Sequence, residues 1–301
     1  MELPPWLSTL CDRRSIPYID LRVSPLRFGR DLYLAMATND RSIYERIHRF
    51  AVPQDECRLE ASIMAASVRC HQRRLESQGR HQFTLGSCLV YIGQVGDDAA
   101  VLSPRGTFLR CEDYAGRLRM LDKGQRLLYK PHPYACAFAD REKSAVADIF
   151  GRKPEICLQN TYQILSSPDE VEIVAISSGV IQEAAYFNKP GHLLYRSFCP
   201  LAGDDDEFDA GRFIQVRFQD ILAPGFWHAV LAPQRPAPRV SRIQPVQPNQ
   251  FREALDQWWD YSKFLLWERS FWVEAYVRSG GGALRTRVAE LERRLDDRDR
   301  T

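Results

Sequence analysis

The chain has 301 residues, of which 45% are hydrophobic and 27% are charged. It carries 41 Lys and Arg against 39 Asp and Glu, which leaves a formal net charge of only +2. These values are typical of a soluble globular protein and exclude a disordered, collagen-like or disulfide-built chain. The balanced charge also argues against a dedicated nucleic-acid-binding protein, which usually has a strong basic excess.

Location and redox state follow from the same simple features. No apolar stretch approaches the ~20 residues that a membrane-spanning helix needs, and the first residues do not resemble a secretory signal. The eight cysteines are scattered through apolar segments and form no Cys-x-x-Cys pair. We therefore expect reduced, buried thiols, a cytoplasmic location and no zinc site.

Short apolar runs alternate with helical patterns up to about residue 232. This alternation favours an α/β fold with mostly parallel sheets, and it forms two groups, one before about residue 124 and one after it. Each group is expected to hold its ligands at the carboxyl ends of its strands. The predicted strands are 18–21, 88–92, 126–129, 172–176, 192–195 and 213–216, and the predicted helices are 42–50, 60–76 and 180–187.

The C-terminal part of the chain has a different composition. Residues 232–250 contain five prolines and are predicted to form an extended connector, because proline is excluded from helix interiors and central strands. Residues 251–278 form a helical pattern rich in aromatic side chains. Residues 283–300 carry a stripe of four apolar side chains, which fits either a solvated terminal helix or a coil for self-association.

One segment places a cation and an imidazole at the end of a predicted strand. Lys130 and His132 follow the apolar run 126–129, and Pro131 and Pro133 restrict the backbone around them. Together the two side chains make a suitable anion site. The alternative is that His132 is an ordinary structural hydrogen-bonding residue.

A second segment passes from strand to helix through small residues. Ser177, Ser178 and Gly179 would present hydroxyls and backbone N–H groups at the start of helix 180–187, where a phosphate is favoured. Glu183 lies one turn into that helix and is expected to reach outward to sugar hydroxyls. The alternative is an ordinary serine cap. Taken with Lys130 and His132, this turn suggests a sugar nucleotide as the simplest ligand.

A third segment follows the predicted strand 88–92. Gly93, Gln94 and Gly96 lead into Asp97 and Asp98 at the presumed strand end, where a carboxylate can act as a base or a nucleophile. The alternative is a polar turn.

These three segments together resemble the bacterial retaining β-Kdo transferases, where Kdo is 3-deoxy-D-manno-oct-2-ulosonic acid. The matching motifs are Gly-Gln-Val-Gly-Asp-Asp-Ala at 93–99, Lys-Pro-His-Pro at 130–133, and Ser-Ser-Gly at 177–179 with Glu183 and Ala184. Bacterial sialyltransferases share the His-Pro and Ser-Ser elements. Weaker similarity covers 18–34 and 218–228, and Ala100 stands where the family pattern has a serine.

The resemblance implies a GT-B-like arrangement of two Rossmann-like lobes followed by a C-terminal helical segment. Residues 1–125 would form the acceptor and nucleophile lobe, 126–232 the CMP-sugar lobe, and 233–301 the connector and C-terminal helices. In such a protein the aromatic segment 251–278 would cross back as core. Alternatively, it would contact a membrane from the cytoplasmic face, where a lipid-linked acceptor resides.

The resemblance also implies roles for individual residues. His132, Pro133 and the Ser177–Gly179 turn would hold the CMP phosphate, with Lys130 and Gln94 beside them, and Glu183 would bind ribose. Asp98 would be the nucleophile of a double displacement, with Asp97 in reserve. Asp20, at the end of the first strand, is the candidate acid/base residue, although no motif carries this role over.

The function that the resemblance implies is transfer of Kdo from CMP-Kdo to a saccharide acceptor in capsule or O-antigen synthesis, with retention. No cofactor and no metal are expected, since protein cations would neutralise the CMP leaving group. Two alternatives stay open. One is an inverting transferase for CMP-sialic acid or another CMP-ulosonic acid, and the other is a non-catalytic sugar-nucleotide-binding module.

Overall fold

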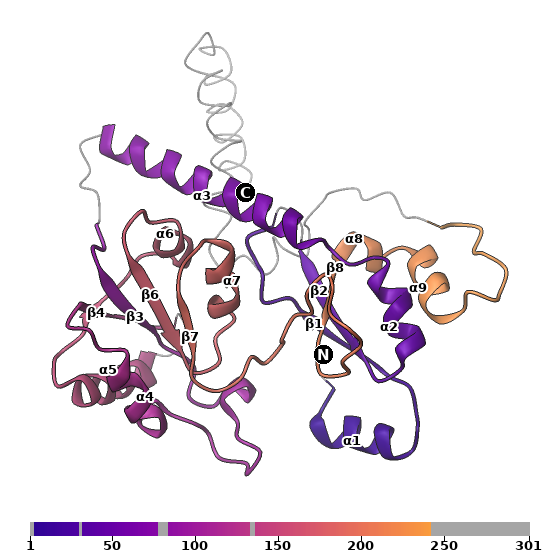
Figure 1. Cartoon of the computed structure of the whole chain (residues 1–301), viewed down its shortest axis with the longest axis horizontal. Coiled ribbons are helices and arrows are strands. Elements are labelled where there is room, and N and C mark those ends of the chain that lie inside the picture. Colours follow the sequence, from indigo (N-terminus) through magenta and orange to yellow (C-terminus); the bar gives the residue numbers. More distant parts are fainter. Residues whose placement is uncertain (1–2, 30–31, 78–83, 133–135, 242–301) are drawn as a thin grey trace, which may run out of the picture.

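The computed structural model describes residues 3–29, 32–77, 84–132 and 136–241. In this part of the chain two sheets lie side by side, each with its own helices (Figure 1). The strands are β1 (Ile19–Val23), β2 (Tyr33–Thr38), β3 (Cys88–Ile92), β4 (Arg126–Lys130), β5 (Glu155–Ile156), β6 (Val171–Ala175), β7 (Gly191–Leu193) and β8 (Ile214–Arg217). The helices are α1 (Pro5–Arg13), α2 (Arg41–His48), α3 (Gln54–Ser77), α4 (Ala115–Met120), α5 (Cys136–Phe150), α6 (Thr161–Leu165), α7 (Val180–Tyr186), α8 (Phe218–Ile221) and α9 (Pro224–Leu231), with short 3-10 turns η1 (Ala99–Val101) and η2 (Cys111–Tyr114).

The larger sheet has five parallel strands in the order β5-β4-β3-β6-β7. Chain order runs outward from β3 in one direction through β4 and β5, and then in the other through β6 and β7. This is a doubly wound order, and its direction reverses between β3 and β6. In open parallel sheets, ligands bind outside the carboxyl ends of the strands at such a reversal. The fold therefore directs attention to the loops that follow β3 and β6.

Helices cover both faces of this sheet, which explains its uninterrupted apolar strands. Alternate side chains of β3 separate into two cores. Val90 and Ile92 pack with side chains of α3, α6 and α7, whereas Leu89 and Tyr91 pack with side chains of α4 and α5. All five residues of β3 are buried. The α/β architecture with a parallel sheet, expected from the alternating pattern, is confirmed.

The smaller sheet is antiparallel, with β2 between β1 and β8. All six residues of β2 are buried, and their core includes side chains from α2, α8 and α9. The prediction of a first Rossmann-like lobe containing both 18–21 and 88–92 is wrong, because β1 pairs only in this antiparallel sheet. The strand expected at 88–92 lies instead at the centre of the parallel sheet, beside β4 and β6.

The predicted division at residue 125 therefore separates two neighbouring strands, β3 and β4, of a single sheet. Conversely, β8 belongs to the second predicted group but completes the sheet of β1 and β2. The reason is that strand pairing joins segments far apart in sequence, which a division by chain order cannot represent.

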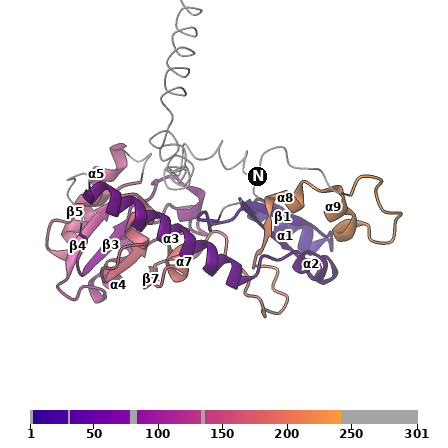
Figure 2. The same cartoon turned by 90° about the horizontal axis from the view of Figure 1, so that it is seen from above.

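The long helix α3 runs along both sheets, as the two views in Figures 1 and 2 show. It begins at Gln54, six residues before the predicted helix, and packs Ala61, Met64 and Val68 into the core beside β3 and β6. Near its start, Cys57 receives a hydrogen bond from Gln215 of β8 at 3.0 Å. The helix thus contacts the strands of both sheets.

Other expectations concern the chain ends. Residues 232–241 form neither helix nor strand; the N–H of Arg235 donates to the carbonyl of Ala232 in a turn, and the carbonyl of Ser241 accepts from the N–H of Gly225 in α9. The predicted aromatic helix and the apolar stripe lie outside the described residues. Among the described helices, none is long and apolar enough to cross a membrane.

Candidate active site at the carboxyl edge of the parallel sheet

The loops after β3 and β6 are joined directly at the point where the strand order reverses. The side chain of Gln94 makes two hydrogen bonds with Ser177: Nε2 donates to the hydroxyl at 2.9 Å, and Oε1 accepts from the backbone N–H at 2.8 Å. Both residues are buried, at 7% and 4% exposure. We call this pair the Gln94–Ser177 bridge. It fixes two of the three predicted motifs against each other.

The third motif lies on the adjacent strand. Lys130 ends β4, and its ammonium donates to the carbonyl of Gln159 at 2.7 Å. Burial lowers the pKa of Lys130 below its ordinary value. An ammonium has three donors, so this bond leaves it able to contact an anion at the same edge.

His132 follows two residues later and is half-buried. Burial lowers its pKa below the ordinary value for histidine; the carboxylate of Asp98 opposes this shift, and Arg27 and Lys130 reinforce it. The neutral form of the ring is therefore favoured over the charged one, and two cations and one carboxylate act on it electrostatically. Pro133, the remaining residue predicted on this segment, lies outside the described residues.

Asp98 and Asp97 are both exposed in the loop that follows β3. Asp98 caps the 3-10 turn η1, where its Oδ1 accepts from the backbone N–H of Ala100 at 2.9 Å. Its carboxylate acts electrostatically on His132 and opposes the lowering of the pKa of that ring. This electrostatic effect links two residues that lie 34 positions apart in the sequence.

Arg27 is a site residue that the sequence analysis missed. It comes from the segment between β1 and β2, in the other sheet, yet its guanidinium acts electrostatically on His132. Its backbone N–H donates to Glu183 Oε1 of α7 at 2.9 Å. Arg27 lies within the stretch 18–34 of weaker similarity, but no motif there gave it a role or linked it to the parallel sheet.

The turn after β6 agrees with expectation only in part. The hydroxyl of Ser178 accepts from the N–H of Val180 at 3.4 Å, but the N-cap residue of α7 is Gly179 and no side chain caps the helix. Gly179 lies against Pro25, whose Cβ would be 3.0 Å from a side-chain Cβ at that position. This close approach brings the segment before Arg27 onto the start of α7.

Glu183 does not reach outward as predicted. It is only 3% exposed, and its Oε1 accepts from the hydroxyl of Tyr162 at 2.8 Å as well as from the N–H of Arg27. Since both donors are protein groups, the observed role of this carboxylate is to tie the Arg27 segment to α6 and α7.

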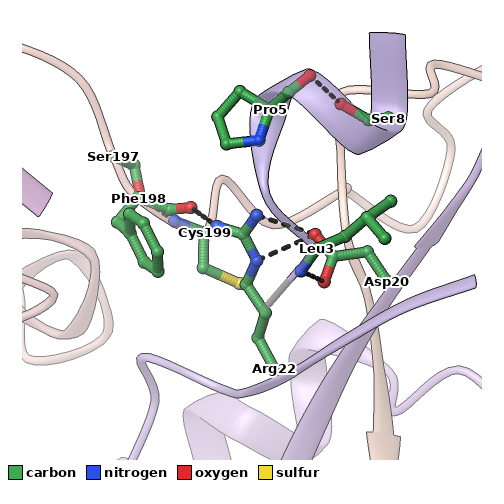
Figure 3. A network of polar contacts seen from close by, with 8 residues as sticks. All are labelled: Leu3, Pro5, Ser8, Asp20, Arg22, Ser197, Phe198 and Cys199. Carbon is green, nitrogen blue, oxygen red and sulfur yellow. Dashed lines mark hydrogen bonds and ion pairs between the residues drawn. The ribbon is translucent and has the colours of Figure 1, made fainter. Parts of the chain in front are cut away.

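Asp20, the predicted acid/base residue, belongs to a different network (Figure 3). Its carboxylate pairs with Arg22 at 2.7 Å and accepts from the backbone N–H of Leu3 at 3.2 Å. Arg22 also donates to the carbonyl of Phe198 and lies over that ring, 4.3 Å from its centre. Among the described residues, no contact joins Asp20 to Asp98 or His132, so the structure gives Asp20 a structural ion pair.

Two hollows of the surface lie away from this edge. One, of about 740 Å³, is lined by residues at the amino ends of β3 and β6, such as Cys88 and Val171. The other, of about 380 Å³, lies beside α2 and Phe208. Neither is lined by a predicted site residue. Within the described part of the chain, no group of three or more His, Cys, Asp or Glu side chains is arranged to hold a metal ion.

The fold and the site define a class: an α/β protein in which the Gln94–Ser177 bridge joins two loops at the carboxyl edge of a doubly wound parallel sheet. No protein-family model matches the chain, and no curated protein matches it. Among solved structures it is similar to "Thermosulfurimonas dismutans KpsC, beta Kdo 2,7 transferase", at 18% identity and a TM-score of 0.33. The similarity covers 62% of this chain and 63% of that one, and at this TM-score it shows at most a distant relation.

Proposed function

We propose that the chain is a glycosyltransferase that uses a CMP-activated acidic sugar. The observation that carries the proposal is the Gln94–Ser177 bridge at the reversal of strand order, and the electrostatic effect of Asp98, Arg27 and Lys130 on His132 supports it. A carboxylate facing an imidazole beside two cations suits a donor with an anionic leaving group. The motif resemblance described above supports Kdo as the sugar and retention as the outcome.

In the proposed reaction the CMP phosphate binds to His132, Lys130, Arg27 and the Ser177–Gly179 turn. A carboxylate oxygen of Asp98 attacks the anomeric carbon as the bond from that carbon to the phosphate oxygen breaks, and CMP leaves with the electron pair. An acceptor hydroxyl then displaces Asp98 and loses its proton to a base. Two inversions give net retention, as in retaining glycosidases.

The acceptor is proposed to bind on the side of the three-stranded sheet, as in a GT-B arrangement. It is a saccharide of a bacterial capsule or O-antigen. The cations on the protein neutralise the developing phosphate charge, so the proposed mechanism needs no metal. Gln94 acts in this scheme by holding Ser177, and Glu183 by holding the segment that carries Arg27.

The test of the nucleophile uses Asp98→Asn, because an asparagine keeps the cap on Ala100 while removing the charge. Incubation with CMP-Kdo and no acceptor should give the wild-type chain one covalent sugar adduct by intact-mass analysis. Asp98→Asn should give no adduct and lose transfer by at least about a thousandfold. Asp97→Asn, one residue away and also exposed, should keep both; loss of the adduct in this variant and not in Asp98→Asn would move the nucleophile to Asp97.

The outcome decides between the candidates. An active Asp98→Asn enzyme without an adduct in the wild type contradicts the double displacement. Inverted product stereochemistry would favour the CMP-sialic acid type of transferase, in which an aspartate serves as a general base. Binding of CMP without turnover on several acceptors would favour a non-catalytic sugar-nucleotide-binding module.

A further inference from the structure

A buried carboxylate lies directly beneath the candidate site, on a helix that no motif singled out. Glu142 of α5 is only 4% exposed. Its Oε1 accepts from the hydroxyl of Tyr91 at 3.2 Å, and its Oε2 accepts from the hydroxyl of Tyr129 at 2.8 Å and from the backbone N–H of Gln94 at 3.3 Å. It therefore joins β3, β4 and the first residues of the loop after β3.

The loop after β3 is shaped to lie on this helix. A Cβ atom at Gly93 would stand 2.8 Å from Glu142 Oε2 and 2.7 Å from the Tyr129 hydroxyl. A Cβ atom at Gly96 would stand 2.5 Å from the ring of Phe138. Phe138 and Glu142 are four residues apart and so share one face of α5. The two glycines of the motif thus allow close packing of the loop on two successive turns of the helix.

Gln94 connects this packing to the site. Its backbone N–H is held by Glu142, and its side chain forms the Gln94–Ser177 bridge. We propose that Glu142 is a positioning residue, which holds the corner at Gly93 and Gln94 so that Ser177 is kept in place to bind the donor's phosphate. The identity of the ligand in this inference rests on the proposed function. The hydrogen bond between Glu142 and the N–H of Gln94 does not depend on it.

The ionisation of Glu142 provides a readout. Burial raises its pKa to about 7, against the opposing hydrogen bonds from Tyr129, Tyr91 and Gln94. Cys111 and Glu112 of η2 are the other titratable groups that act on it. Ionisation spreads negative charge over both oxygens, and hydrogen bonds to a charged acceptor are stronger, so the hydrogen bond from Gln94 strengthens as pH rises through about 7.

The first measurement needs no ligand. In protein labelled with ¹⁵N-glutamine, the amide proton of Gln94, assigned by its loss in Gln94→Ala, should shift with a midpoint near pH 7. In Glu142→Gln that titration should disappear. In Asp148→Asn, which removes an exposed carboxylate from the same helix, it should remain. A Gln94 amide that does not titrate in the wild type overturns the inference even if Glu142→Gln fails to fold.

The second measurement links the contact to the ligand. The dissociation constant of CMP is measured by calorimetry at pH 6 and pH 8 for wild type and variant. At each pH the ratio of the two constants cancels the effect of titrating the phosphate and His132, which is common to both proteins. Glu142→Gln should bind CMP about tenfold more weakly at pH 8, the order expected for loss of a charge-assisted hydrogen bond, and less so at pH 6. If both proteins bind CMP with the same dissociation constant at pH 6 and at pH 8, the positioning role is contradicted. Failure of the wild type to bind CMP contradicts the proposed function instead.

Discussion

His132 is surrounded by groups that act on its pKa in opposite directions. Burial, Arg27 and Lys130 favour the neutral ring, whereas Asp98 favours the charged one. A bound phosphate would add negative charge beside the ring and raise its pKa, which would allow a stronger hydrogen bond to the leaving group. The neutral state in the unliganded protein is thus compatible with anion binding.

These opposing effects give a prediction that requires no substrate. Removing a neighbouring cation should raise the pKa of His132, and removing the neighbouring carboxylate should lower it further. Arg27→Gln is therefore expected to shift the ring titration to higher pH, and Asp98→Asn to lower pH. The measurement is the pH dependence of the His132 Hε1 proton signal. Arg49→Gln, which removes an exposed cation on another element, should leave the titration in place.

The same variant addresses binding. Arg27→Gln should weaken CMP affinity by about tenfold, because a charged contact to the phosphate is lost. If the pKa of His132 fell in Arg27→Gln and rose in Asp98→Asn, neither Arg27 nor Asp98 would face His132. Unchanged CMP affinity in Arg27→Gln would remove Arg27 from the phosphate site while leaving its neighbours in place.

At the scale of elements, the strands of the parallel sheet were the most predictable part. β3 was expected at its observed bounds, because a continuous apolar run between Gly86 and Gly93 is typical of a strand buried on both faces. β2 was missed, since Tyr-Leu-Ala-Met-Ala-Thr has weak strand propensity and no alternation. Its pairing with strands on both sides decides its conformation, and local pattern does not contain that information.

In the loop after β3, close packing leaves no room for a side chain at Gly93. At Gly93 an added methyl group would meet the backbone oxygen of Lys130 at 3.1 Å in addition to the two side chains below it. Gly93→Ala is therefore expected to lower the free energy of unfolding by about 1–3 kcal/mol. It should also weaken CMP binding, because the displaced corner carries Gln94.

Gly116 of α4 is the matched control for this prediction. An added Cβ there would have no neighbour within 4 Å, and the position is helical. Gly116→Ala should raise stability by about 0.4–1 kcal/mol, since alanine loses less backbone entropy on folding. Urea denaturation of both variants measures the difference. A neutral Gly93→Ala would mean that the corner relaxes freely and is not held by α5.

For the molecule as a whole, the site depends on how the two sheets meet. The Gly-Gln, Lys-Pro-His and Ser-Ser motifs could be located from sequence because each follows a recognisable strand, and neighbouring parallel strands end at one edge. Arg27 and Glu142 could not. Arg27 contacts Glu183 across 156 positions, and Glu142 contacts Gln94 across 48. Neither separation leaves a periodic signal in a single sequence.

Contacts around the segment before β2 join the two sheets. Pro25 lies against Gly179 at the start of α7, and the N–H of Arg27 donates to Glu183 of the same helix. The antiparallel sheet thus contributes one cation to a site otherwise built by the parallel one.

Glu183 tests whether the two parts of the chain are held together by the observed contacts. A structural role and a ribose-binding role for this residue predict different effects on the stability of the ligand-free protein. Glu183→Ala leaves the hydroxyl of Tyr162 and the N–H of Arg27 without their buried acceptor, at a cost of about 1–3 kcal/mol each. We expect the melting temperature of the ligand-free protein to fall by roughly 5–10 °C. Exposed Glu170→Ala is the control and should change it little. If Glu183 instead acts by binding ribose, the ligand-free melting temperature stays constant and only the affinity for CMP decreases, so one thermal scan with and without CMP separates the two roles.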